Sequence, residues 1–413
     1  MRLRPVVTAV VAGGLAGLVA VLTYEAMIGL QRLIWLGDDG DPLRTMVTII
    51  AGGGLLLLLG RIAPSESMEE LLRDADKPLA RSRRRIGVTA LVAVVSIAFG
   101  GAIGPEAGLL AVVAECSVLV SRFVAQDEAH AIAQAGNAGA LSGLYGSPPA
   151  MAILDEGSPA PSRLMSFVAG ISGFGVFLLI ARTVFGGEGV ATVPLPAPEP
   201  GAAWLVIVPI LVGVAFGIGF RVLHAAMKGL SARIRHRWIV TTVGTFLFAG
   251  IAALIPLVRF SGHHELGDVV SIHADGGAGE LWVLAVAKLL AVVVCLASGW
   301  RGGEVFPLLF VGAAAGAATA LSVPGIDPAA ATAGAMAAAL TVGWRRPLAA
   351  LLILVLVTEP GVALPLVLGT GIGAVLDRVL FPTRSGDDGP DVPVSTPGRT
   401  DGADGERPDR RTR

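Results

Sequence analysis

The sequence predicts an all-α integral membrane protein made of two inverted halves, with broken and re-entrant helices. Composition is the first observation: 54% of the 413 residues are hydrophobic and only 15% are charged, whereas soluble domains contain about 25% charged residues. The 55 glycines lie inside apolar runs without a collagen-like period, and small residues let membrane helices pack closely. We expect roughly fourteen to eighteen hydrophobic helices, many of them too short to span a bilayer alone.

An internal repeat is the second observation. Near the start of each half, a pattern of small and apolar residues recurs 200 residues later: Gly13, Gly17, Ala26, Met27, Gly29 and Leu30 reappear as Gly213, Gly217, Ala226, Met227, Gly229 and Leu230. Farther along, Gly104 and Glu106 recur as Gly302 and Glu304, with an offset of 198. The near-constant offset indicates duplicated halves, which are common in transporter folds.

Basic residues in the loops indicate that the two halves are inverted. The acidic loop at 38–41 corresponds to a basic stretch at 228–237, and the basic stretch at 81–85 corresponds to residues 261–279, which contain no Lys or Arg. Short cytoplasmic loops collect Lys and Arg, so equivalent loops face opposite sides of the membrane. We therefore expect both ends of the chain on the cytoplasmic side of a cell membrane.

These patterns divide the chain into four segments. We predict a first transmembrane repeat at 1–185, an extracellular proline-rich linker at 186–203, a second, inverted repeat at 204–382 and a disordered polar tail at 383–413. The first apolar run, at about 6–36, is too long for a signal-peptide core, so we expect it to be retained as a helix.

Charge and cysteine content argue against several classes of protein. The net charge of −1 offers no basic field for a nucleic acid. Cys116 and Cys295 lie in separate apolar stretches, so we expect no disulfide framework, metal site or cofactor. Histidines and carboxylates gather at 263–273, but their irregular spacing in a predicted external loop favours a solvated loop over a metal site.

Glycine and proline interrupt apolar segments at matching places in the two halves. Residues 101–108 (GAIGPEAG) precede a helix expected at about 109–124, and residues 299–307 (GWRGGEVFP) precede one expected at about 308–321. Matched breaks of this kind point to an ion site near the bilayer midplane. Free amides and the positive end of the helix dipole would bind an anion there. The alternative is a pair of ordinary glycine-rich bends.

These segments resemble those of the CLC family of chloride channels and proton-coupled anion exchangers. Gly104-Pro105-Glu106-Ala107-Gly108 is similar to the family segment whose glutamate is the external gate. Gly302-Gly303-Glu304-Val305-Phe306-Pro307 is similar to the segment whose amides bind the anion. The resemblance covers about residues 5–382. It implies transport of a small inorganic anion, chloride by default, by a channel or a proton-coupled exchanger that forms a homodimer.

The resemblance assigns the ion pathway to a small set of residues: Gly104, Pro105, Glu106, Ala107, Gly302, Gly303, Glu304, Val305, Phe306 and Ser65. Ser65 is only a loose match to the family's filter serine, and the pore tyrosine has no match. Asp155 and Glu156 stand about one helical turn before the place of the exchangers' internal glutamate, so either or neither relays protons. Proton coupling therefore stays open.

Glu106 and Glu304 are the two ionisable residues of the predicted ion site. Glu106, at the start of its helix, would compete with a permeant anion for the same positive site, and protonation would release it. The alternative role is a helix cap. Glu304 stands where the family has an apolar residue, so the pathway is expected to hold two facing carboxylates unless Glu304 pairs with Arg301.

Other functional classes compete with anion transport. Fluoride transport, or cation and proton transport, would suit Glu304 and the poorly matched serine. An intramembrane hydrolase using Asp155 with Glu304 lacks any Gly-x-Ser-Gly or Tyr-Asp motif. A membrane receptor that transports nothing is the remaining alternative. The prediction is a transporter and not an enzyme, with an anion, possible protons and lipid as its partners.

Overall fold

Fifteen α-helices run through the part of the chain that the computed structural model describes, namely residues 3–37, 40–62, 83–120, 126–154, 160–186, 195 and 203–382. The first half contains α1 (Leu3–Ile34), α2 (Pro42–Ile62), α4 (Arg83–Ala98), α5 (Glu106–Val120), α6 (Gln126–Tyr145), α7 (Pro148–Leu154) and α8 (Ala160–Thr183). The second half contains α9 (Ile207–Arg233), α10 (Arg237–Leu254), α11 (Leu266–Ala274), α12 (Ala278–Ser298), α13 (Val305–Ser322), α14 (Pro328–Trp344), α15 (Pro347–Val357) and α16 (Ala363–Leu380). Short 3-10 turns precede α9, α11 and α16.

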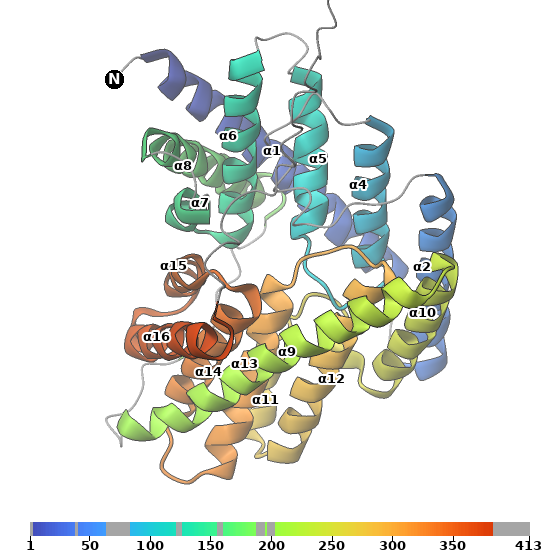
Figure 1. The fold of residues 1–413 in the computed structure, drawn as a ribbon, viewed down its shortest axis with the longest axis vertical. Helices are drawn as coiled ribbons and strands as arrows, with labels where there is room; N and C mark the ends of the chain where they lie inside the picture. Colours follow the sequence, from blue (N-terminus) through green and yellow to red (C-terminus); the bar gives the residue numbers. More distant parts are fainter. Residues whose placement is uncertain are drawn as a thin grey trace, which may run out of the picture.

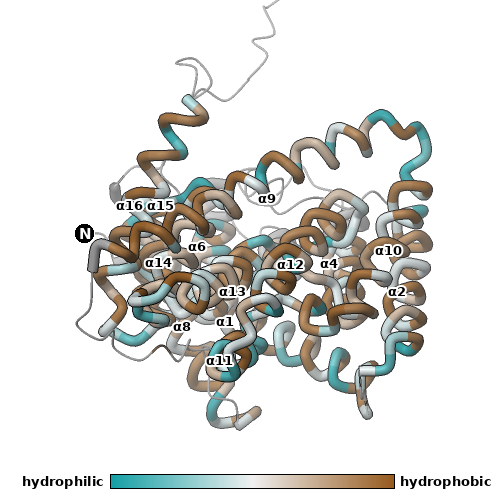
Figure 2. The backbone as a smooth tube through the Cα atoms, turned by 90° about the horizontal axis from the view of Figure 1, so that it is seen from below, coloured by the Kyte–Doolittle hydropathy of each residue, from teal (hydrophilic) through white to brown (hydrophobic). Residues whose placement is uncertain are grey.

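The helices provide the apolar lengths that a membrane requires. Among the described residues, eight helices are long and apolar enough to cross a bilayer: α1, α2, α8, α9, α10, α12, α13 and the segment Pro360–Leu380. Large apolar side chains such as Leu33 and Leu254 are exposed, and Figure 2 shows hydrophobic residues along much of the length of the helices. The protein is therefore a multi-pass membrane protein, as the composition predicted.

Several helices are too short to cross a bilayer. The nine residues of α11 rise about 14 Å, and the eleven of α15 about 17 Å, against a hydrocarbon core of about 30 Å. Neither helix can cross the membrane by itself. By contrast, α13 and α14 are buried along nearly their whole lengths, so the second half supplies the centre of the bundle.

Among the described residues, the helices of the first half recur in the same order in the second half, with α1, α2 and α4 to α8 corresponding to α9, α10 and α12 to α16. In Figure 1 most of the first half lies in the upper part of the molecule and the second half in the lower part. The halves meet where α2 packs against α10 and where the short helices α7 and α15 pack against each other. Broken helices from both halves therefore converge at their interface.

Backbone conformation corrects the register of the repeat. Gly100 and Gly299 both adopt left-handed φ angles, of 90° and 98°, and so do Gly146 and Arg345, at 65° and 60°. Each pair is 199 residues apart, and α5 and α13 also begin 199 residues apart. The offset of 198 predicted for this region is wrong, because it matched glycines by identity, and neighbouring glycines can be matched in more than one register.

The corrected register changes the counterparts of the two glutamates. Glu106 is the first residue of α5, and Val305 is the first residue of α13. Glu304 therefore corresponds to Pro105 and not to Glu106. Both helices begin three residues earlier than the sequence predicted, because their first turns contain the very residues that were assigned to the preceding loops.

Small residues set the distance between the long helices. A Cβ atom at Gly13 in α1 would overlap the backbone of Ala169 in α8, and one at Gly139 in α6 would overlap the backbone of Gly13. In the second half, a Cβ atom at Gly213 in α9 would likewise overlap the backbone of Ala335 in α14. Each half is thus held by backbone-to-backbone packing, which membrane helices favour.

We predict that Gly13→Val lowers the thermal stability of the detergent-solubilised protein, because the added side chain must push α1 away from α8. Overpacking of this kind typically costs about 1–3 kcal/mol. Gly29→Val is the matched control, since Gly29 lies in the same helix with nothing within 4 Å of its Cβ position. Equal melting temperatures for the two variants would contradict the packing described here.

Candidate ion site

Two glycine loops, one from each half, meet at the centre of the protein. The Gly104 amide donates to the Gly303 carbonyl at 2.8 Å, and the Gly303 amide donates to the Gly104 carbonyl at 2.9 Å. This antiparallel bridge joins two residues at equivalent positions of the repeat. Only glycine fits beside it, because a Cβ atom at Gly302 would overlap Ile103 and crowd the Gly104 carbonyl. The bridge brings the N-termini of α5 and α13 together.

Matching backbone bonds hold the two loops in place. The Gly101 amide donates to the Ser96 carbonyl, and the Trp300 amide donates to the Cys295 carbonyl, again 199 residues apart. The left-handed residues Gly100 and Gly299 make these turns possible, since a Cβ atom is disfavoured at such φ angles. The chain therefore leaves α4 and α12 by the same route and enters α5 and α13 facing each other.

The Glu106 side chain lies on the bridge. It is fully buried, and a Cβ atom at either Gly104 or Gly303 would overlap its carboxylate. The backbone amide of Phe306 and the hydroxyl of Tyr145 face this carboxylate, yet neither oxygen makes a hydrogen bond with any described residue. A carboxylate thus lies between two helix N-termini, where backbone donors and helix dipoles favour a negative charge.

The structure brings most of the predicted site residues together. Ala107, Val305 and Phe306 are buried in the first turns of α5 and α13. Glu304 precedes α13, is half-buried, and lies close enough for its charge to act on the Glu106 carboxylate. The predicted pathway residues Ser65, Asp155 and Glu156 lie outside the described residues.

Tyr145 is a site residue that the sequence did not reveal. This last residue of α6 is fully buried, with its ring 5.6 Å from that of Phe306 and 6.4 Å from that of Trp344. Trp344 ends α14 and is its counterpart in the repeat. Both α6 and α14 are rich in small residues and end on an aromatic residue, which was the available signal in the sequence. The two aromatic residues align only when the repeat offset is 199.

His263 also departs from the sequence prediction. It is buried beneath the start of α13, with its ring 4.8 Å from that of Phe306. Its Nε2 lies 3.0 Å from the Tyr24 hydroxyl, and its Nδ1 lies 2.6 Å from the Ser261 hydroxyl. The expectation that the whole loop is solvated is wrong here, because this segment folds inward against α1 and α13. The described residues contain no cluster of three metal-ligating side chains.

A buried lysine fixes the loop that carries His263. Lys288 of α12 is fully buried, and its ammonium donates to the carbonyls of Val258, Arg259 and Phe260 at 2.8–3.1 Å. The Phe260 amide in turn donates to the Gly100 carbonyl at 3.1 Å. Lys288 therefore braces one of the two turns that lead to the glycine bridge.

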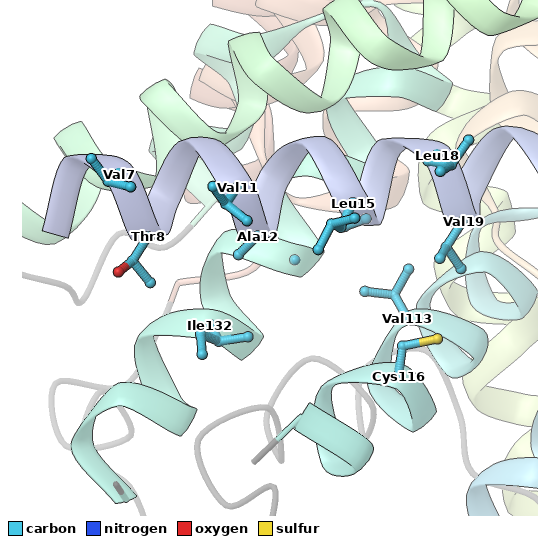
Figure 3. A pocket seen from close by; sticks show the side chains of 12 residues that line it. Val7, Thr8, Val11, Ala12, Leu15, Leu18, Val19, Val113, Cys116 and Ile132 are labelled. Atoms are coloured by element: carbon cyan, nitrogen blue, oxygen red, sulfur yellow. The ribbon is translucent and has the colours of Figure 1, made fainter. Parts of the chain in front are cut away.

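An apolar groove of about 490 Å³ lies between α1, α5 and α6, away from the residues of the bridge. Figure 3 shows that valine, leucine and isoleucine side chains dominate its lining, with Thr8 and Cys116 as the polar exceptions. None of its lining residues belongs to the glycine bridge. Such a surface suits lipid and offers few ligands to an ion.

Comparison with known proteins identifies the family. A family model described as "Voltage gated chloride channel" matches residues 64–378, well over half of the chain. The chain belongs to this family, the CLC family. Its members are channels or transporters and not enzymes, which confirms the prediction that this CLC protein is no enzyme.

Curated relatives of this CLC protein cover most of its length. It is 26% identical over 360 residues to the "Putative ion-transport protein YfeO" of Shigella flexneri, which covers 78% of this chain and 80% of that one. It is 25% identical over 336 residues to the protein of the same name from Salmonella typhimurium, with coverage of 75% and 78%. Both relatives are described as ion-transport proteins.

Solved structures confirm the predicted fold. A slow cyanobacterial Cl⁻/H⁺ antiporter aligns with a TM-score of 0.75 and 19% identity, covering 92% of this chain and 96% of that one. A CLC-type fluoride/proton antiporter aligns with a TM-score of 0.68 and 18% identity, covering 90% and 95%. The CLC-like inverted repeat is therefore established, while such low identities show the fold alone.

We predict that Lys288→Met lowers the free energy of unfolding by about 2 kcal/mol, because the substitution leaves buried carbonyls without a donor. A fall in melting temperature in detergent measures the effect. Lys228→Met is the matched control, since Lys228 is exposed on α9 and surface changes usually stay within about 0.5 kcal/mol. If both variants have the same melting temperature, Lys288 does not brace the loop.

Proposed function

We propose that the protein transports a small inorganic anion, chloride by default, through the meeting point of α5 and α13, and that Glu106 gates this route. The single observation that supports the proposal most is the buried Glu106 carboxylate on the glycine bridge, at the start of two opposed helices. Membership of the CLC family supports the same transport class.

The chemistry of the site suits competition between the carboxylate and an anion. Amides in the first helical turn lack partners within the helix. The helix dipole adds the equivalent of about half a positive elementary charge at the N-terminus. Glu106 places its own negative group there, facing the Phe306 amide. A free anion would use the same donors once the side chain turned away. Protonation would favour that step, because it removes the charge that the site attracts.

Glu304 is proposed to modulate this competition. A unit negative charge about 4 Å from an anion costs about 4 kcal/mol at an effective dielectric constant near 20. Glu304 must therefore stand farther from the anion, be neutral when the anion binds, or pair with another group. The hydroxyl of Ser65 as an anion ligand, and Asp155 or Glu156 as proton relays, stay predictions of the sequence.

A second candidate is fluoride transport, or transport of a cation with protons. Glu304 favours this candidate, because its charge acts on the Glu106 carboxylate. A second carboxylate beside the gate lowers the occupancy of the site by a large anion and can itself bind a proton. The poor match at Ser65 points the same way. Efflux measured across chloride, fluoride and sodium distinguishes these ions in one assay.

The proposed setting is a cell membrane, with the N- and C-termini cytoplasmic and the linker at 186–203 outside. We propose repeat boundaries at 1–185 and 204–382, with a cytoplasmic tail at 383–413. A homodimer is proposed from the family resemblance. The apolar side chains exposed on α8 and α16, among them Ile171 and Val367, would allow such an interface.

We predict that Glu106→Gln raises chloride efflux from proteoliposomes several-fold at neutral pH and removes most of its dependence on pH. The amide mimics the protonated carboxylate, so the competing charge is absent at every pH. Efflux is measured with a chloride electrode at matched amounts of reconstituted protein.

Glu280→Gln is the matched control, since Glu280 also lies in the first turn of a helix, α12, but is exposed. It tests whether the loss of any glutamate from a helix start changes efflux. If Glu106→Gln behaves like Glu280→Gln in rate and in pH response, Glu106 is a helix cap and not a gate.

A further inference from the structure

The hydroxyl of Tyr145 is a buried hydrogen-bond donor that the gate mechanism leaves unused. The residue is fully buried, and its Oη makes no hydrogen bond with the residues that the structure describes. Such a group costs free energy, so unpartnered buried polar atoms are rare and often functional. Tyr145 and Glu106 share this property and face each other.

The Tyr145 ring packs against two other aromatic rings. Its centroid lies 5.6 Å from that of Phe306, whose amide also faces Glu106, and 6.4 Å from that of Trp344. Immediately after Tyr145, the left-handed Gly146 turns the chain into α7, and the Ser147 hydroxyl donates to the Leu352 carbonyl of α15 at 3.0 Å. A tyrosine held in this way has little freedom to point elsewhere.

The donor and acceptor chemistry defines what this hydroxyl can bind. An ionised carboxylate only accepts hydrogen bonds, and so does a halide, whereas a phenol offers one O–H donor. The Phe306 amide is a second donor directed at the same place. One phenol and one amide would thus bind any small anion that replaced the carboxylate.

We propose that the Tyr145 hydroxyl donates a hydrogen bond to the transported anion when that anion takes the place of the Glu106 carboxylate at the glycine bridge. Tyr145 is then the side-chain ligand of the anion, supplied from the end of α6. This inference rests on the proposed function, because it assigns a ligand to the same site. It differs from a packing role, in which the ring matters and the hydroxyl does not.

The test removes the hydroxyl in a background without the gate. Proteoliposomes containing Glu106→Ala are compared with those containing Glu106→Ala and Tyr145→Phe, and chloride efflux is measured as a function of chloride concentration. We expect the second change to raise the half-saturating chloride concentration about tenfold, as for the loss of one hydrogen bond to a charged group. A residue that acts only on the Glu106 carboxylate would have no effect in this background.

Ser142→Ala in the same background is the matched control. Ser142 also lies in α6, and its hydroxyl is also buried without a partner among the described residues. It lies against Gly170 of α8 and is not among the nearest neighbours of Gly104, Gly302 or Gly303. We expect this control to leave the half-saturating concentration unchanged.

A second measurement avoids any change in packing. The chain has two tyrosines, so a Tyr24→Phe protein produced with 3-fluorotyrosine carries the label at Tyr145 alone. The more acidic hydroxyl is a stronger donor, and it should lower the half-saturating chloride concentration relative to unlabelled Tyr24→Phe.

The outcomes separate this inference from the proposed function. Normal efflux in every variant with unchanged half-saturating concentrations overturns the role of Tyr145 and leaves the Glu106 gate intact. An equal effect of Ser142→Ala and Tyr145→Phe also overturns it, since any lost hydroxyl would then suffice. Absence of chloride and fluoride efflux from the wild-type protein contradicts the proposed function, and the ligand role falls with it.

Discussion

The pair of reciprocal hydrogen bonds between Gly104 and Gly303 is the constraint on which the rest of the site depends. It joins the two halves of the chain where each is most irregular, between a broken helix and the next helix start. Irregular backbone at membrane depth is tolerated only where it is buried in protein or lines a cavity. Here each loop satisfies the polar groups of the other, so two helix N-termini can point at one place.

Contacts around the bridge hold its two loops in place. Lys288 and the Phe260 amide brace one of the turns, and His263 packs beneath Phe306. The glycines leave room for a carboxylate but not for a Cβ atom. In the proposed function, an anion would enter when the Glu106 side chain rotates away, without rearrangement of the helices.

The sequence predicted the fold far better than it predicted the details of the site. Apolar content, repeated glycines and inverted loop charges depend on bulk properties of the membrane, and they gave the correct class and symmetry. The register failed by one residue, because Gly101–Gly104 and Gly299–Gly302 match by identity while Gly100 and Gly299 match by conformation. Glu304 was consequently assigned to the wrong counterpart, although it does lie near Glu106.

Residues that reach the site from other helices and loops could not be predicted from the sequence. Tyr145 and His263 contact Phe306 from α6 and from the loop before α11, and no local pattern in the sequence reveals contacts between segments that lie far apart in the chain. His263 was read as solvated because polar loops usually are, and tertiary packing overrode that rule. The motif glycines were recognisable because the absence of a side chain is itself the signal, although the bridge that joins Gly104 to Gly303 was not predicted.

The most direct measurement of the central claim is anomalous diffraction from crystals of the Glu106→Gln protein grown in bromide. If two helix N-termini form the anion site, a bromide peak should appear at the Gly104–Gly303 bridge, within hydrogen-bonding distance of the Phe306 amide and the Tyr145 hydroxyl. Bromide peaks confined to other parts of the protein, with none at the bridge, would contradict the account.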